Sequence, residues 1–243
     1  MNYLSIPKCW TGCAAALMLL AGTAGAQVAN LADGPIALAA NVTGIVIDGD
    51  LSDWPEDTAR VPMRNDFGAY GGTDLDGRDL STSDDFSPAM MVGYDDEKDL
   101  LYVAVIARDD RLVMDGDSIF RDGIEIYLSD LSAGSQPYQY RLATSRNAQV
   151  ETRGGDLQFS GTWRNYGDHL IYEWQGGVPN GASRRSPLEQ GDIIGFDVVA
   201  IDNDGNGNAA WVPWGPPVPS KSHGNDRVGR LLLAPTDMSV ADA

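Results

Sequence analysis

The sequence contains few cysteines and histidines, the residues that form disulfides and most zinc sites. It has two cysteines in 243 residues, Cys9 and Cys13, and both lie at the extreme N-terminus. Its two histidines, His169 and His223, are far apart and lack the spacing of a zinc site. Neither a Gly-x-Ser-x-Gly motif nor a Ser-His-Asp arrangement is signalled. We therefore expect no disulfide framework, no zinc centre and no enzymatic activity.

Basic residues are also scarce. Lys and Arg number 17 against 35 Asp and Glu, which gives a formal net charge of −18 at pH 7. Such a surface repels nucleic acid and anionic lipid, so neither is expected as a partner. A neutral ligand or a cation suits this charge, although many secreted proteins are acidic simply because acidity keeps them soluble.

No hydrophobic run is long enough to span a membrane. The one notable run, residues 14–21, follows Lys8 and precedes the small residues Ala24-Gly25-Ala26. This pattern predicts a cleaved signal peptide over residues 1–26 and hence a secreted or periplasmic protein. Cleavage there would also remove both thiols.

Helical periodicity is missing, and strand-like segments recur instead. The length suits one all-β domain. We expect a leader or linker over 27–43, a β-sandwich over 44–234 and a flexible tail over 235–243. About ten antiparallel strands with turn-rich connections indicate a jelly-roll or immunoglobulin-like sandwich. The predicted strands are 45–47, 88–94, 100–107, 124–128, 138–145, 149–153, 157–163, 169–174, 193–201 and 228–233.

Two of these patterns make specific predictions. Residues 100–107 are nearly all apolar, as in a central strand buried on both faces, and the acidic turn 95–98 should join them to 88–94 as a hairpin. In the next strand, Glu125 and Tyr127 alternate with aliphatic residues. A period of two places these two side chains on one face and the aliphatic ones in the core.

The segment Ile45–Trp54 combines strand, turn and aromatic signals. Its β-branched start predicts a short strand over 45–47, and Asp48-Gly49 is strong turn chemistry. An isolated exposed Trp would be unfavourable, so Trp54 is expected to pack back onto the domain.

A run of alternating oxygen-bearing side chains occupies residues 202–206 and is followed by glycine, as in the first half of a calcium loop. Pro213 stands where an EF-hand has its closing acid, so the segment is not an EF-hand. Two interpretations remain open: a calcium site completed by acids from elsewhere, or a hairpin turn without an ion. The candidate ligands are Asp202, Asp204, Asn206, Asp48 and Asp50.

Aromatic and charged residues suggest a binding site. Trp211 and Trp214 follow the polar loop, where they could stack on sugar rings or plug the end of the sandwich. Glu125 and Arg141 lie on adjacent predicted strands, where a carboxylate and a guanidinium could grip vicinal hydroxyls. The alternative for the latter two is a surface ion pair of little energetic value.

The order of these motifs resembles that of family 9 carbohydrate-binding modules. The resemblance implies a non-catalytic β-sandwich that binds sugars, often the ends of glucan or xylan chains, and carries structural calcium. It also implies a role beside a glycoside hydrolase or a surface polysaccharide system. The matching segments are Ile47–Trp54, Tyr94–Val105, Arg121–Tyr127, Tyr138–Leu142, Ile194–Val198 with Asp202, Trp211, and Arg227–Leu233.

The resemblance also implies roles for single residues. Glu125 and Arg141 match the family's Glu and Arg that bind sugar hydroxyls, and Trp211 matches one of two Trp rings that clamp the sugar. The sequence departs from the family twice.

The other clamp Trp falls at Ile119 or Phe120, so Phe120 is expected to stack in its place. A strand amide falls at Val199, which cannot hydrogen-bond through its side chain. Losing one satisfied polar contact weakens binding by about 1–3 kcal/mol, so the family's usual ligand does not transfer directly.

A second interpretation is a haem-binding relative within the same broad superfamily, in which Met pairs with His or Lys as axial ligand. The residue types are present as Met90, Met91, Lys221 and His223. Methionines without a pattern are more commonly core residues.

Overall fold

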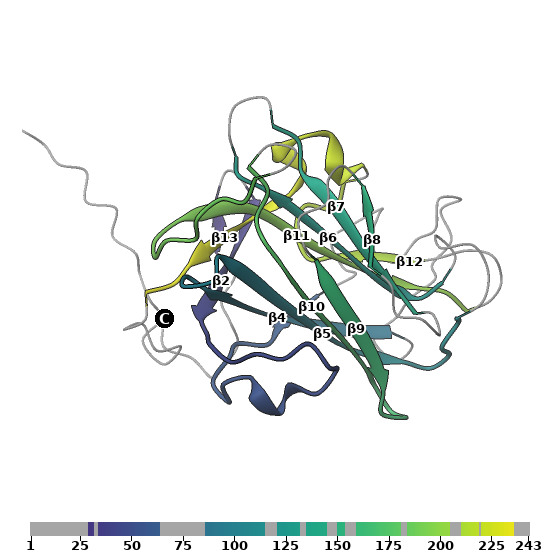
Figure 1. Cartoon of the computed structure of the whole chain (residues 1–243). Helices are drawn as coiled ribbons and strands as arrows, with labels where there is room; N and C mark the ends of the chain where they lie inside the picture. The colour runs from purple at the N-terminus through teal and green to yellow at the C-terminus, as the bar shows by residue number, and fades with distance from the viewer. Residues whose placement is uncertain are drawn as a thin grey trace, which may run out of the picture.

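The described part of the chain is mostly β-strand, and its strands form a nearly closed sheet in two facing layers (Figure 1). The computed structural model describes residues 29–31, 34–63, 86–114, 121–131, 135–144, 150–153, 159–180, 184–204, 210–218 and 220–235. Within these residues, helix is limited to short 3-10 turns. The all-β class predicted from the sequence is confirmed, and the two layers are consistent with a sandwich.

The strands follow the order β8-β7-β6-β11-β13-β2-β4-β5-β10-β9 across the sheet, with β1, β12 and β3 attached to β2, β11 and β4. Pairing is antiparallel except where β2 meets β13 and β4, which it joins in parallel. The strands are β1 Ala29–Leu31, β2 Gly34–Asn41, β3 Val61–Pro62, β4 Phe86–Asp95, β5 Leu100–Asp109, β6 Gly123–Ser129, β7 Tyr138–Ala143, β8 Val150–Arg153, β9 Ser160–Asn165, β10 Leu170–Gly176, β11 Ile193–Asp202, β12 Ala210–Pro213 and β13 Gly229–Leu233.

Strand β2 joins the two layers of the sheet. Residues 27–43 were expected to form a leader strand or a linker, and residues 34–41 of this stretch form a strand between β13 and β4 (Figure 1). The small side chains of Ala37 and Ala39 point into the core, 4% and 0% exposed. Short residues without a strong strand signature therefore occupy an interior position of the sheet.

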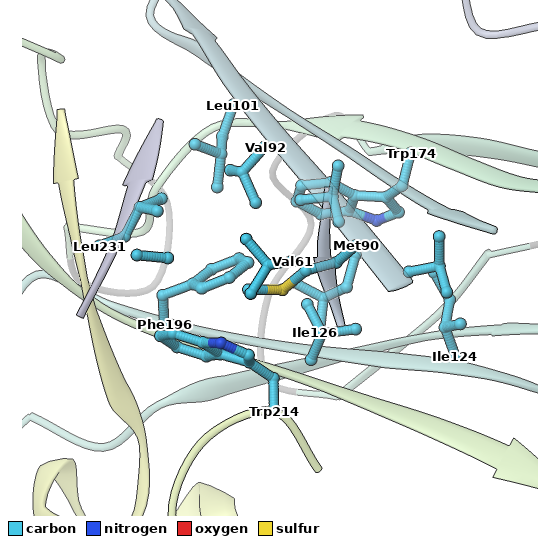
Figure 2. Packing of buried hydrophobic residues seen from close by; sticks show 14 of the residues in the cluster. Val61, Met90, Val92, Leu101, Ile124, Ile126, Trp174, Phe196, Trp214 and Leu231 are labelled. Atoms are coloured by element: carbon cyan, nitrogen blue, oxygen red, sulfur yellow. The ribbon is translucent and has the colours of Figure 1, made fainter. Parts of the chain in front are cut away.

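The core lies between the two layers and is built by period-two alternation. Ile124 and Ile126 of β6 point into the core that also holds Trp174 of β10 and Met90 of β4 (Figure 2), and Leu128 belongs to the same buried cluster, as predicted. Full burial of side chains this large contributes about 1.5–3 kcal/mol each to stability. The expected hairpin is also confirmed, since β4 and β5 pair in antiparallel register across a tight turn.

The segment from Ile45 to Trp54 does not begin with a strand, so that prediction is wrong. Its backbone amides bond to carboxylates instead of to a neighbouring strand. Asp53 Oδ2 accepts from the Val46 amide at 2.6 Å, and Glu173 Oε2 accepts from the amides of Asp48 and Gly49, both at 2.9 Å. Alternation of buried and exposed side chains thus arises without a ladder of backbone hydrogen bonds.

Trp54 closes this segment onto β10, as predicted. Its side chain is 4% exposed, and its indole Nε1 donates to Glu173 Oε1 at 2.8 Å. Both oxygens of one carboxylate on β10 therefore hold the turn and the Trp together. Burial raises the pKa of Glu173, while these three hydrogen bonds act in the opposite direction.

Of the helices in the described parts of the chain, none is long and apolar enough to cross a membrane.

Candidate functional site

Five side chains from four neighbouring strands share the face of the sheet that points away from the core. Register fixes this arrangement, because Glu125 of β6 lies opposite Arg141 of β7 and Val199 of β11, and Ile201 of β11 lies opposite Trp211 of β12. Paired residues in an antiparallel sheet point to the same side. We call this surface the outer face; it comprises Glu125, Tyr127, Arg141, Val199 and Trp211.

The polar part of the outer face is a buried carboxylate–guanidinium pair. Arg141 Nη1 lies 3.5 Å from Glu125 Oε1, and the two side chains are 6% and 2% exposed. The structure thus brings these two predicted residues together. Because both side chains are buried, the alternative of a surface ion pair is wrong. Buried charges require close polar partners. The Tyr127 hydroxyl donates to Glu125 Oε2 at 2.6 Å, and Arg141 Nη2 donates to the Arg121 carbonyl at 3.3 Å.

The apolar part of the outer face surrounds Trp211. Tyr127, Val199, Ile201 and Val228 form a small buried cluster, separate from the main core, and the partly exposed Trp211 packs against it. Val199 occupies the position where the resemblance implies an amide, and here it contributes apolar surface. The outer face therefore places an aromatic ring and an apolar floor beside a carboxylate and a guanidinium.

Trp214, which was also expected to stack on a ligand, does not lie on this face. Trp214 points into the core, is 3% exposed and packs against Phe196 with ring centroids 5.8 Å apart (Figure 2). Trp214 is therefore a residue of the main core. Phe120 lies outside the described residues.

A second polar cluster lies where three strand ends meet. Asp109 at the end of β5, Asp122 before β6 and Asp202 at the end of β11 have carboxylate oxygens within 4.8 Å of one another. Backbone amides of Val113 and Asn203 donate to Asp122. Burial, together with the neighbouring carboxylates, raises the pKa of Asp122 to about 8.

Sequence reasoning identified Asp202 and missed its two partners. The sequence did offer one indication of Asp109 and Asp122. Both acids lie next to buried strands, and such acids can converge at one end of a sandwich. The other predicted acidic ligands that the structure describes, Asp48, Asp50 and Asp204, do not belong to this cluster. Asp204 follows the end of β11 outside it, and Asn206 lies outside the described residues.

Asp48 and Asp50 serve the turn instead. Asp48 Oδ1 accepts from the Asp50 amide at 2.8 Å, and Asp50 Oδ1 accepts from the Ser52 amide at 3.0 Å, where it caps the 3-10 turn η1 Leu51–Asp53. These bonds stabilise the entry segment, as Asx turns and caps commonly do.

The residues named as haem ligands occupy separate environments. Met90 and Met91 lie in different apolar clusters on opposite faces of β4. Lys221, in the 3-10 turn η3 Lys221–His223, is buried and donates to Asp197 Oδ2 at 2.5 Å. His223 is exposed. Core packing and a buried ion pair account for the first three residues.

Comparisons with known proteins support the fold. No protein-family model matches the chain, and no curated protein matches its sequence. A family 9 carbohydrate-binding module from Caldicellulosiruptor kristjanssonii, solved in complex with glucose, is similar over 84% of this chain and 98% of its own, with 17% identity and a TM-score of 0.65. A structure of such a module from the same organism with cellotriose gives 83% and 95%, 18% identity and a TM-score of 0.64. At this level of identity the likeness establishes the fold.

Proposed function

Starting from a chain with the fold of family 9 carbohydrate-binding modules, we propose that it is a secreted, non-catalytic module that binds a mono- or oligosaccharide on its outer face. One observation carries the proposal: a partly exposed Trp211 on β12 lies on the same face as the Glu125–Arg141 pair on β6 and β7, with β11 between them. The two similar structures hold glucose and cellotriose, which makes glucan ends the first ligand class to test.

The residues on the outer face supply the two kinds of contact that a sugar needs. An aromatic ring stacks against the C–H face of a pyranose, while hydroxyls at the ring edge need partners. Glu125 accepts from a hydroxyl, and Arg141 donates to one. Few contacts offset the loss of ligand freedom, so binding is expected to be modest.

The geometry of the polar pair favours exchange with a sugar. The contact of 3.5 Å between Arg141 and Glu125 is at the limit of a hydrogen bond. A sugar hydroxyl placed between them would replace this long contact with two of ordinary length. Because both side chains are nearly inaccessible, binding would also displace the atoms that cover them.

Calorimetric titration with glucose, cellobiose, cellotriose, xylose and xylotriose tests the function. Heat and a change in Trp fluorescence are expected with at least one member of this panel. The absence of both signals with every member would overturn the proposal. A carbohydrate ligand would point to a partner glycoside hydrolase or surface polysaccharide system.

We also propose that Asp109, Asp122 and Asp202 hold a structural calcium ion, the cofactor implied by the resemblance. The donor set fits, because carboxylate oxygens are the ligands that calcium prefers and these three converge within 4.8 Å. Two of the three are buried, where gathered negative charge is unfavourable without a cation. An ion there would connect β5 in one layer to β6 and β11 in the other.

A further inference from the structure

We propose that Lys221 and Asp197 form a covalent amide between their side chains, which fastens the connection between β12 and β13 onto β11. The proposal goes beyond sugar binding and does not depend on it. It starts from a buried ion pair, since Lys221 Nζ lies 2.5 Å from Asp197 Oδ2 and the two side chains are 5% and 0% exposed. Taking two opposite charges out of water is unfavourable, and an amide between them would remove both charges.

The carboxyl group of Asp197 is closely approached by backbone. The Gly215 amide donates to Asp197 Oδ1 at 2.9 Å. A Cβ atom at position 215 would lie 2.2 Å from Oδ2 and 2.7 Å from Cγ, so only glycine permits this approach. The Gly215 N–H is therefore placed to hold the negative charge that gathers on Oδ1 when a nucleophile attacks Cγ, as in an oxyanion hole.

Two backbone carbonyls orient the ammonium group of Lys221. Nζ donates to the Pro216 carbonyl at 2.5 Å and to the Arg227 carbonyl at 3.2 Å, in addition to Asp197. When the proton shared with Asp197 moves to Oδ2, the carbonyls retain the other two N–H groups, and the free electron pair points at the carboxyl group. Burial favours this neutral pair and raises the pKa of Asp197, although Lys221 acts in the opposite direction.

The condensation needs no further reagent. The electron pair of Nζ forms a bond to Cγ, and the Gly215 amide holds the charge on Oδ1. A second proton then passes from Nζ to the Oδ2 hydroxyl, the Cγ–Oδ2 bond breaks, and one water molecule leaves. An ammonium and a carboxylate thus give an amide and water, with no change in net charge or oxidation state. Fixed contact between the two groups replaces a bimolecular encounter.

The amide would do for this chain what a disulfide does in many secreted proteins. Both cysteines, Cys9 and Cys13, lie in the predicted signal peptide. The link would tie β11 to the 3-10 turn η3, which precedes the last strand, β13. A cross-link of this kind restricts the unfolded chain and so favours the folded one.

The mass of the intact, denatured protein tests the inference, once the N-terminus of the purified chain has been determined. The mass should be lower than the sequence mass by one molecule of water. After digestion with trypsin and chymotrypsin, the peptides that contain Asp197 and Lys221 should remain joined, although chymotrypsin cleaves after Trp211 and Trp214 between them. The full sequence mass after prolonged incubation of the folded protein, or two separate peptides, would overturn the inference.

Two controls show whether the loss of water belongs to this pair. Lys221→Arg retains the positive charge but has no primary amine, so this variant should have its full mass. Lys98 and Asp95 form another ion pair, with 2.7 Å between Nζ and Oδ2, but Lys98 is 54% exposed. A solvated ammonium stays charged, so this pair should be found without a link. Loss of water in the Lys221→Arg variant, or a cross-link at Lys98 in place of Lys221, would contradict the assignment.

Discussion

At the scale of single residues, the proposed sugar binding depends first on Trp211. Replacing it with Ala removes the only partly exposed aromatic ring described there, so affinity for the best sugar should fall at least tenfold, since stacking a ring is worth about 1–3 kcal/mol. Calorimetry measures the change. Tyr166→Ala, which removes an exposed aromatic side chain after β9, should leave binding unchanged. Equal losses in the two variants would count against the assigned face.

Arg141 should be intolerant of a change that preserves its charge. Lysine presents one compact cation and cannot reach Glu125, the Arg121 carbonyl and a ligand with a planar fork. Arg141→Lys is expected to weaken sugar binding about tenfold or more, which corresponds to about 1.4 kcal/mol of binding free energy. The free energy of unfolding should fall by less than this amount. The exposed Arg164→Lys serves as control. Full affinity in the Arg141→Lys variant would contradict a role of the guanidinium group in sugar binding.

Glu173 shows how one side chain can replace a strand pairing. Its carboxylate accepts from the Trp54 indole and from two backbone amides, all buried or partly buried. Glu173→Gln turns one acceptor oxygen into a donor and leaves part of these groups unsatisfied. We expect a loss of about 2–4 kcal/mol in the free energy of unfolding, measured by urea denaturation. The exposed Glu56→Gln should cost less than about 0.5 kcal/mol.

At the scale of elements, the ends of β5, β6 and β11 form one structural unit. If Asp109, Asp122 and Asp202 hold calcium, a chelator should lower the melting temperature by several degrees, and added calcium should restore it. Asp122→Asn should abolish this calcium-dependent difference. Asp48→Asn is the matched control, since that acid serves a turn. Equal melting temperatures of the wild-type protein with calcium and with chelator would contradict the assignment.

The elements also show which sequence signals were informative. Strands β4, β5 and β11 are long apolar segments, and their positions and the β4–β5 hairpin followed directly from the residues. Ile45–Ile47 had the same β-branched signal but forms no strand, because Asp53 and Glu173 accept its backbone bonds or those of the following turn. Strand propensity describes a side chain's fit to a pleated surface and does not identify the partner of its backbone.

At the scale of the whole molecule, the class and the outer face were predictable, while the clustering of acids was not. Glu125, Arg141 and Trp211 could be brought together because neighbouring strands with period-two alternation share a face. Asp109 of β5 approaches Asp122 and Asp202 only because the fold brings strands of the two layers close together, which no local sequence pattern shows. Trp214 was ambiguous for a related reason, since one position along a strand separates the outer face from the core.

Strand β2 has a consequence for how this chain acquires its structure. It lies between β4 and β13, and it pairs Ile36 with Arg230, near the opposite end of the sequence. Strand β2 can pair with β4 early, but its pairing with β13, and with it the junction between the two layers, must wait until β13 has been synthesised. Contacts this distant slow folding. The protein is therefore expected to fold late and as one unit, and to remain open to chaperones and proteases until its final strand is available.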